Sequence, residues 1–295
     1  LKGGLPVAVP AVTVNKVCGS GLKAVMLASQ AIRCGDATAI VAGGMENMSA
    51  APHIAQGLRR GIKLGDVELV DAMVLDGLTC SFGSCHMGMH AEHVAETSNV
   101  TREEQDQFAL QSQQRAAKAM QEGLFAEEIV PVTVKHRKGE QVIDADEGPR
   151  PETTIEGLSK LRAAFDRSGS VTAGNASILS DGAAAVVVAD EATAASAPWK
   201  FKILACHTSG AEPKDLFVAP VTAVEGALKK ANLTADDIDL FEINEAFASQ
   251  MVACLKELKL DNDKVNILGG GISLGHPIGA SGARVLVTLM YALRR

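Results

Sequence analysis

The sequence predicts an α/β protein in which helices cover a parallel or mixed sheet, with a separate segment inserted into its first half. Three observations support this fold class. Short apolar or β-branched runs alternate with helix-spaced apolar runs at both ends of the chain, as in proteins built from strand–helix–strand units. The middle, about residues 49–178, is instead rich in charged residues and polar helix formers. Strand-like sequence returns at residues 180–190 ("SDGAAAVVVAD").

The N-terminal elements follow from periodicity. Residues 9–17 are apolar and β-branched, which predicts a strand. Apolar residues then recur at helical spacing from Leu22 to Ile32, and Gly35, a residue typical of helix ends, marks the stop. Residues 37–42 form another apolar run that ends at a glycine pair, and this predicts a buried strand.

The middle segment carries its own signals. Thr101 and Glu104 have the spacing of a helix capping box. Residues 130–146 ("VPVTVKHRKGEQVIDAD") predict a hairpin, and the charged runs predict solvated surface. We therefore expect an N-terminal half made of residues 1–48 and 179–199, an inserted cap domain over 49–178, and a C-terminal half over 200–295.

The C-terminal half repeats the alternating pattern. Helices are predicted over 221–230, 246–258 and 282–293, and strands over 238–243 and 265–268.

A weak internal repeat relates the two ends of the chain. Residues 20–23 (Ser-Gly-Leu-Lys) match residues 281–284 (Ser-Gly-Ala-Arg), and each group follows a Gly-rich turn and opens an apolar helix. A helix–strand–helix unit precedes the second copy but not the first, and a strand follows the first copy but not the second. The repeat therefore predicts two related halves, each incomplete, in a chain truncated at both ends.

Composition excludes several classes. The 295 residues carry a formal net charge of −7, which argues against a nucleic-acid partner because phosphate binding needs a basic surface. No apolar run approaches the roughly 20 residues of a membrane span. The six cysteines have no zinc-site spacing, so no metal is expected and most are interpreted as small buried residues in a reducing compartment. That compartment would be the cytoplasm, or the mitochondrial matrix in a eukaryote.

Cys18 is the first candidate for chemistry. It lies in "VCGSG", at the start of the first predicted helix, where the helix dipole and free backbone N–H groups favour the thiolate. A buried structural cysteine is an equally good interpretation of this stretch alone.

His276 and Asn244 extend the candidate site. His276 lies in a glycine-dense loop that occupies, in the repeat, the place of the Cys18 loop, so the two could form a Cys–His pair. Asn244, in "EINEAFA", could hold a water or an oxyanion, or could cap a helix. Glu245 is interpreted as a first-turn charge. The small residues 171–186 could lie against an extended ligand such as a pantetheine arm.

Five motifs taken together resemble the thiolases: "VCGSGLKAV", "VAGGMENMS", "TAGNAS" with "DGAAAVV", "NEAFA" and "GHPIGASG". The resemblance runs along nearly the whole chain, and "CHMG" (residues 85–88) resembles the short-chain, biosynthetic acetyl-CoA C-acetyltransferase type. It implies an αβαβα layering of two related halves with an inserted cap domain. The implied reaction is the reversible Claisen condensation of two acetyl-CoA to acetoacetyl-CoA and CoA.

The resemblance also implies roles. Cys18 would carry the acyl group, His276 would activate it, and Asn244 would hold a water that completes an oxyanion hole. No cofactor beyond coenzyme A as substrate is implied, and a homo-oligomer, tetramer or dimer, is expected. The residues that match the CoA and acyl pocket of the family are His86, Met87, Arg162, Phe165, Ala173, Ser177, Leu216, Ala246 and Phe247.

Departures from the family pattern leave alternatives open. The second catalytic cysteine of the family, in a Cys-x-Gly-Gly-Gly loop, is not among the 295 residues, so the chain as written is expected not to catalyse condensation. Leu216 stands where the family has an acyl-pocket Met. The alternatives are a longer-chain 3-ketoacyl-CoA thiolase, a decarboxylating ketoacyl synthase, and a catalytically incomplete CoA-binding form.

Overall fold

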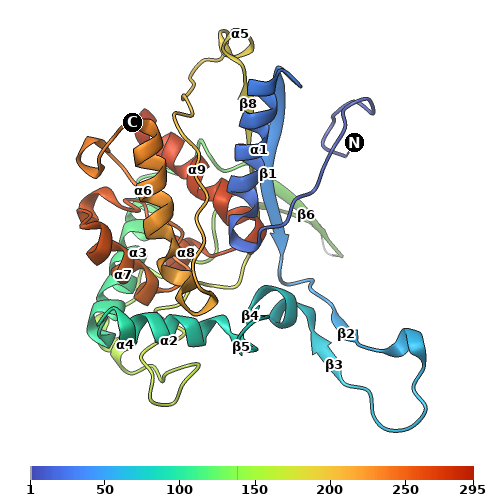
Figure 1. Cartoon of the computed structure of the whole chain (residues 1–295), viewed down its shortest axis with the longest axis vertical. Coiled ribbons are helices and arrows are strands. Elements are labelled where there is room, and N and C mark those ends of the chain that lie inside the picture. The colour runs from blue at the N-terminus through green and yellow to red at the C-terminus, as the bar shows by residue number, and fades with distance from the viewer. Residues whose placement is uncertain (1, 138) are drawn as a thin grey trace.

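A two-stranded ribbon lies at the centre of the N-terminal half. The computed structural model describes residues 2–137 and 139–295. Strand β1 (Ala39–Asn47) pairs with β8 (Asp181–Ala189) in an antiparallel register that runs from Ala39 opposite Ala189 to Asn47 opposite Asp181. The strand predicted over 180–190 is therefore confirmed, and the whole middle segment is inserted between two neighbouring strands (Figure 1).

Two helices cover one face of this ribbon. Helices α1 (Ser20–Cys34) and α9 (Ile278–Arg294) both pack on β1 and β8. The buried cluster between α1 and the ribbon contains Val25, Ala28, Ala42 and Val188. The opposite face of the ribbon is open, with exposed Val41, Met45 and Val187. Of the two sheet types predicted, parallel or mixed, this antiparallel pair is compatible only with a mixed sheet.

The two repeat copies meet at matched glycines. A Cβ atom added to Gly21 of α1 would lie 2.7 Å from the backbone nitrogen of Ala283, and one added to Gly282 of α9 would lie 2.5 Å from that of Leu22. Gly21 and Gly282 are equivalent in the repeat, as are Leu22 and Ala283. The helices thus cross with approximate two-fold symmetry, at a distance that only glycine allows.

The strand predicted over residues 9–17 was wrong. Residues 9–16 have no regular structure, and Val17–Gly19 form a short 3-10 helix, η1, before α1. β-Branched residues favour a strand, but a strand also requires a partner for its backbone N–H and C=O groups. No backbone ladder joins residues 9–16 to another strand among the residues that the structure describes.

The strands predicted over 238–243 and 265–268 are reduced to one parallel bridge between Phe241 and Val265. Asn266 ends this ladder because its φ of 47° is left-handed. Its side-chain amide then replaces the ladder, accepting from the backbone N–H of Ile243 at 2.8 Å and donating to the carbonyl of Ile243 at 2.8 Å. The two segments lie side by side as predicted, but without a continuous strand pair.

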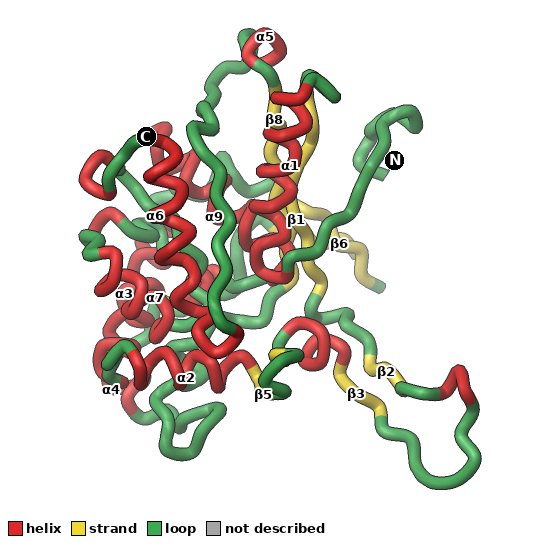
Figure 2. Tube along the Cα trace, in the orientation of Figure 1, coloured by secondary structure: helices red, strands yellow, loops and turns green. Residues whose placement is uncertain are grey.

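A second body of helices packs beside the ribbon (Figures 1 and 2). Helix α3 (Arg102–Gln121) packs on α7 (Ala248–Leu258) around a core that includes Phe108, Met251 and Ile272. The capping box at the start of α3 is confirmed, since the Thr101 and Glu104 side chains each accept from the other's backbone N–H.

The predicted helices near the C-terminus correspond to α6 (Ala219–Ala231), α7 and α9, and the predicted hairpin to β6 (Val132–His136) and β7 (Gly139–Ile143). The hairpin of β2 (His53–Ala55) and β3 (Leu69–Asp71) projects from the body at the lower right of Figure 2. The other named elements are η2 (Leu58–Arg60), η3 (Met73–Gly77), β4 (Thr79–Cys80), β5 (Cys85–His86), α2 (Met87–Thr97), α4 (Ile155–Ser159), α5 (Glu191–Ala194), η4 (Pro213–Val218), η5 (Ala235–Asp237), η6 (Asn262–Lys264) and α8 (Gly271–Leu274). Within the described residues, no helix combines the length and apolar character that crossing a membrane requires.

Candidate functional site

The starts of α1 and α9 bring a thiol and an imidazole together. Cys18 lies in η1, two residues before α1, and His276 lies two residues before α9. The glycine contact between the two helices places Nε2 of His276 3.2 Å from Sγ of Cys18. The Cys–His pair expected from the repeat is therefore present, although the two residues are 258 positions apart in the chain.

The hydrogen bonds of His276 determine which ring nitrogen is free. Nδ1 lies 2.5 Å from Oγ of Ser281, and that hydroxyl donates to the carbonyl oxygen of Pro277 at 2.9 Å. Since the hydroxyl proton is used for the carbonyl, Oγ is left to accept, and Nδ1 carries the ring proton. Nε2 is then the unprotonated nitrogen, and its lone pair faces the thiol of Cys18.

Burial keeps both partners neutral. It lowers the pKa of His276 to about 4, with the charge of Arg284 as a smaller cause. Burial also raises the pKa of the Cys18 thiol to about 11, outweighing a backbone hydrogen bond that lowers it, and the charge of Glu46 adds to the increase. Cys18 as a residue is nevertheless exposed to solvent. The effect of the helix start, which favours the thiolate, is therefore opposed at Cys18 by desolvation, which favours the neutral thiol.

Asn244 lies against the same imidazole. Its Nδ2 is 3.3 Å from Nε2 of His276, and its Oδ1 is buried without a hydrogen-bond partner among the described residues. It does not cap a helix, because α7 begins at Ala248 with Phe247 at the N-cap. The interpretation of Asn244 as a polar group of the site is therefore favoured over the helix-cap alternative, and its free amide oxygen can bind a water molecule.

Glu245 supports the glycine loop from inside. Its carboxylate is 1% exposed and accepts from Oγ of Ser112 at 2.7 Å, Nδ2 of Asn266 at 2.9 Å and the backbone N–H of Ile272 at 3.1 Å. Burial raises the pKa of this carboxyl group, and the three hydrogen bonds lower it. The interpretation as a first-turn charge was wrong, because the residue precedes α7 and is buried.

The small-residue segment 172–180 joins the parts of the site. The backbone N–H of Ser177 donates to the carbonyl of Ala246 at 3.0 Å, and that of His276 donates to the carbonyl of Ile178 at 3.0 Å. A single extended stretch therefore contacts both the Asn244 loop and the His276 loop.

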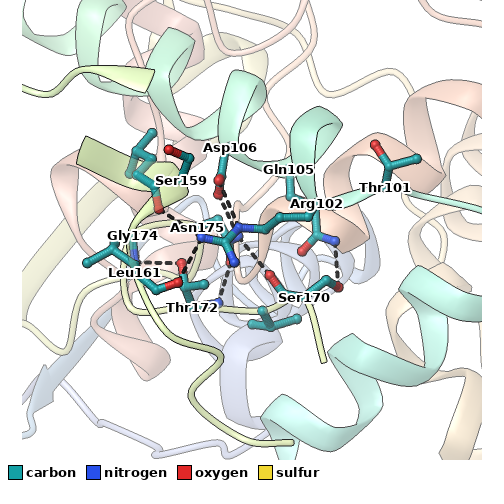
Figure 3. A network of polar contacts seen from close by, with 12 residues as sticks. Thr101, Arg102, Gln105, Asp106, Ser159, Leu161, Ser170, Thr172, Gly174 and Asn175 are labelled. Atoms are coloured by element: carbon teal, nitrogen blue, oxygen red, sulfur yellow. Dashed lines mark hydrogen bonds and ion pairs between the residues drawn. The ribbon is translucent and has the colours of Figure 1, made fainter. Parts of the chain in front are cut away.

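A buried polar network anchors this segment to α3 (Figure 3). Asn175 donates to Oδ1 of Asp106 at 2.9 Å and accepts from the backbone N–H of Thr172 at 2.7 Å. The other carboxylate oxygen of Asp106 accepts from Nε of Arg102 at 2.7 Å, and the same guanidinium donates to the carbonyls of Leu158 and Leu161. The inserted cap thus fixes the backbone on which the site is built.

An aromatic wall lies at the start of α2. The ring of His86 stacks on Phe165 at 4.8 Å between centroids, and Phe247 meets Phe165 and Phe217 edge-on at 6.0 and 5.2 Å. Nδ1 of His86 accepts from the backbone N–H of Gly88, and burial lowers the pKa of His86. Met87 and Ala246 pack on the same cluster. The structure therefore gathers five of the predicted pocket residues.

Other residues are placed differently. Arg162 and Ala173 are exposed, and Leu216 is 43% exposed in η4 while its neighbour Phe217 packs into the wall. Sequence reasoning missed Phe217 and Ser281. The signal for Ser281 was present, because it matches Ser20 in the repeat. Among residues 2–137 and 139–295, no group of three His, Cys, Asp or Glu side chains could hold a metal ion.

Known protein families match the chain in two parts. The family described as "Thiolase, N-terminal domain" matches residues 1–192, and "Thiolase, C-terminal domain" matches residues 197–295.

Individual relatives agree with these matches. An "Acetyl-CoA acetyltransferase" of Pseudomonas aeruginosa is 53% identical over all of this chain and 76% of its own length. Of the solved structures, human mitochondrial 3-ketoacyl-CoA thiolase has a TM-score of 0.95 at 43% identity, covering all of this chain and 75% of that one. The acetyl-CoA acetyltransferase of Syntrophomonas wolfei has a TM-score of 0.96 at 40% identity, covering all of this chain and 76% of that one. The predicted thiolase-like α/β fold class is confirmed.

Proposed function

The chain belongs to the thiolase family of acyltransferases, and from this premise we propose that Cys18 takes an acetyl group from acetyl-CoA in the reversible formation of acetoacetyl-CoA. The observation that carries the proposal is the 3.2 Å contact between Sγ of Cys18 and Nε2 of a buried, neutral His276. The names of the bacterial relatives support acetyl-CoA as the substrate. Coenzyme A is the product that leaves, and no other cofactor is involved.

The first step is acyl transfer to the thiol. As Sγ attacks the thioester carbonyl carbon of acetyl-CoA, its proton passes to Nε2 of His276, and a tetrahedral oxyanion forms. When the bond to the sulfur of coenzyme A breaks, the imidazolium returns the proton to that sulfur. Because burial lowers the pKa of His276 to about 4, the imidazolium is a strong acid and gives the proton up readily.

Two groups are proposed to stabilise the oxyanion. One is a water molecule held by the side-chain amide of Asn244, which lies against His276, and the other is the backbone N–H of Cys18 at the start of the helix. Fixed donors of this kind stabilise a transition state without needing to reorganise.

The aromatic wall is proposed to bind the acyl and pantetheine parts of the substrate. Rings of His86, Phe165 and Phe247 give a dry surface beside the segment 172–180, along which an extended arm can lie. The exposed guanidinium of Arg162 suits the phosphate groups of coenzyme A. Met87, Ala173, Ser177, Leu216 and Ala246 complete the proposed binding surface.

Three further expectations remain proposals. We infer a homo-oligomer, a tetramer or a dimer, whose mass light scattering would measure. We also infer a cytoplasmic location. We also propose the division into three parts. Strands β1 and β8, which pair with each other and flank the insertion, support it. The parts are an N-terminal half (residues 1–48 and 179–199), a cap (49–178) and a C-terminal half (200–295).

Intact-mass spectrometry tests the acyl-transfer step directly. Acetyl-CoA is expected to add one acetyl group to the protein, and peptide mapping is expected to place it on Cys18. Cys18→Ala should remain unmodified, whereas Cys254→Ala, which removes a buried cysteine outside the site, should be acetylated like the parent protein. An unmodified parent protein, or equal acetylation of Cys18→Ala, would contradict the proposal. Faster labelling by acyl-CoA of greater chain length would favour the 3-ketoacyl-CoA thiolase alternative.

A further inference from the structure

A second pair of cysteines lies outside the acyl-transfer chemistry. Strand β4 (Thr79–Cys80) pairs antiparallel with β5 (Cys85–His86), and Cys80 is directly opposite Cys85. Directly opposed residues of an antiparallel pair have Cα atoms about 4.5–5.5 Å apart and side chains on one face. Disulfides span Cα separations of about 4.4–6.8 Å. The backbone therefore already holds these two cysteines at bridging distance.

The two sulfur atoms converge on one small space. A Cβ atom added to Gly83, in the turn between the strands, would lie 3.3 Å from Sγ of Cys85, 3.8 Å from Sγ of Cys80 and 4.0 Å from Cε1 of His90. The backbone N–H of Gly83 also donates to Sγ of Cys80 at 3.4 Å. The absence of a side chain at this position leaves the space in which both sulfurs lie.

The environments of the two thiols differ. Cys85 is half-buried, follows an exposed turn over 81–84, and has Nε2 of the buried His90 3.6 Å from its sulfur. Cys80 is only 7% exposed. A reagent from solution therefore reaches Cys85 first, and the imidazole beside it can accept its proton.

We propose that Cys80 and Cys85 form a reversible disulfide, with Cys85 as the attacking thiol and Cys80 as the resolving thiol. The oxidant is a low-molecular-weight disulfide such as glutathione disulfide. Cys85 passes its proton to Nε2 of His90 and attacks one glutathione sulfur, which releases the other as a thiolate that takes up a proton. Cys80 then attacks the Cys85 sulfur of this mixed disulfide and releases the second glutathione. The protein loses two thiol protons and two electrons, and glutathione disulfide is reduced to two glutathione molecules.

The position of the pair connects its redox state to the aromatic wall. Cys85 directly precedes His86, whose ring stacks on Phe165 and whose Nδ1 caps α2. A covalent bridge would fix the end of β5 from which this ring projects. Formation of this disulfide does not depend on the proposed acyl transfer, and it is measured on a different peptide from the one that contains Cys18.

Peptide mass spectrometry tests the bridge on the whole chain. The protein is incubated with glutathione disulfide, alkylated, and digested with trypsin. The tryptic peptide over residues 64–102 contains Cys80 and Cys85 and no other cysteine. It is expected to lose two hydrogen masses and to resist alkylation until it is reduced. The exposed Cys34 serves as an internal control, and should carry only a reversible glutathione adduct.

Two variants test the assigned roles. Cys80→Ser should stop the reaction at a stable glutathione adduct on Cys85. His90→Gln should slow formation of the disulfide by about a hundredfold, the lower end of what a positioned general base contributes. Full alkylation of both thiols in the parent protein, or a glutathione adduct on Cys85 that persists while Cys80 is present, would overturn the disulfide. An unchanged rate in His90→Gln would overturn the role given to His90.

Discussion

Ser281 is expected to control the reactivity of Cys18 through the imidazole between them. Its hydroxyl holds the proton on Nδ1 of His276, and thereby leaves the lone pair of Nε2 for the thiol. In Ser281→Ala, this selection of one tautomer is lost, and Nδ1 and the carbonyl of Pro277 both lose a buried partner. The thiol would then face a protonated Nε2 in part of the molecules, which cannot take its proton.

The size of the effect follows from the two contacts. A neutral hydrogen bond contributes a net stabilisation of about 0.5–1.5 kcal/mol. Because Ser281→Ala leaves the buried Nδ1 of His276 without a partner, we expect the energy lost to lie at the upper end of that range. Since 1.36 kcal/mol corresponds to a factor of ten in rate, acetylation of Cys18 in Ser281→Ala should be about tenfold slower than in the parent protein.

Single-turnover acetylation, followed by rapid quenching and intact mass, measures this rate. Ser273→Ala is a matched control, because Ser273 is a buried serine of the neighbouring helix α8 that bonds to Ser112 and Gly270 but not to His276. Its acetylation rate should equal that of the parent protein, even where its stability falls. Parent-like acetylation by Ser281→Ala, or equal slowing in both variants, would refute the tautomer argument.

Two further predictions concern charge and packing. The pKa of His276 is lowered to about 4 and that of Cys18 is raised to about 11, so neither group titrates between these values. The acetylation rate, measured by the same quench assay, should therefore stay level from about pH 6 to about pH 9 and fall only as His276 becomes protonated near its folded pKa. A rate that rises through neutral pH would mean that a thiolate is the resting form. Gly21→Ala and Gly282→Ala should each lower the free energy of urea unfolding by about 1–3 kcal/mol, because the new Cβ atom meets the backbone of the other helix. Gly210→Ala, in open space, should change this free energy little. A gain of about 1 kcal/mol in the helix variants, as helix propensity alone requires, would contradict the close crossing.

Local signals in the sequence were sufficient for elements whose partners are also local. The capping box of Thr101 and Glu104 and the β6–β7 hairpin depend on neighbours within a few residues, and both were predicted correctly. The strand over 9–17 failed for the opposite reason. Its composition favours extended backbone, but a strand exists only with a partner, and composition does not reveal one. Asn266 likewise ended a predicted strand through its own left-handed backbone, which periodicity does not report.

The candidate site was predictable in part because it repeats. Cys18 and His276 occupy equivalent loops of two related halves, and the matched glycines of α1 and α9 bring these loops together, so a pattern in the sequence was enough to pair them. The ionisation of the pair was not predictable in the same way. It depends first on how far packing desolvates each group, and then on nearby charges: Arg284 on α9 for His276, and Glu46 on β1 for Cys18. Glu46 itself accepts from the backbone N–H of Gly279 at 3.0 Å. A helix start favours a thiolate only while water can reach it. Here the packing that brings the imidazole to the thiol also desolvates both groups, and this desolvation favours the neutral forms of the thiol and the imidazole.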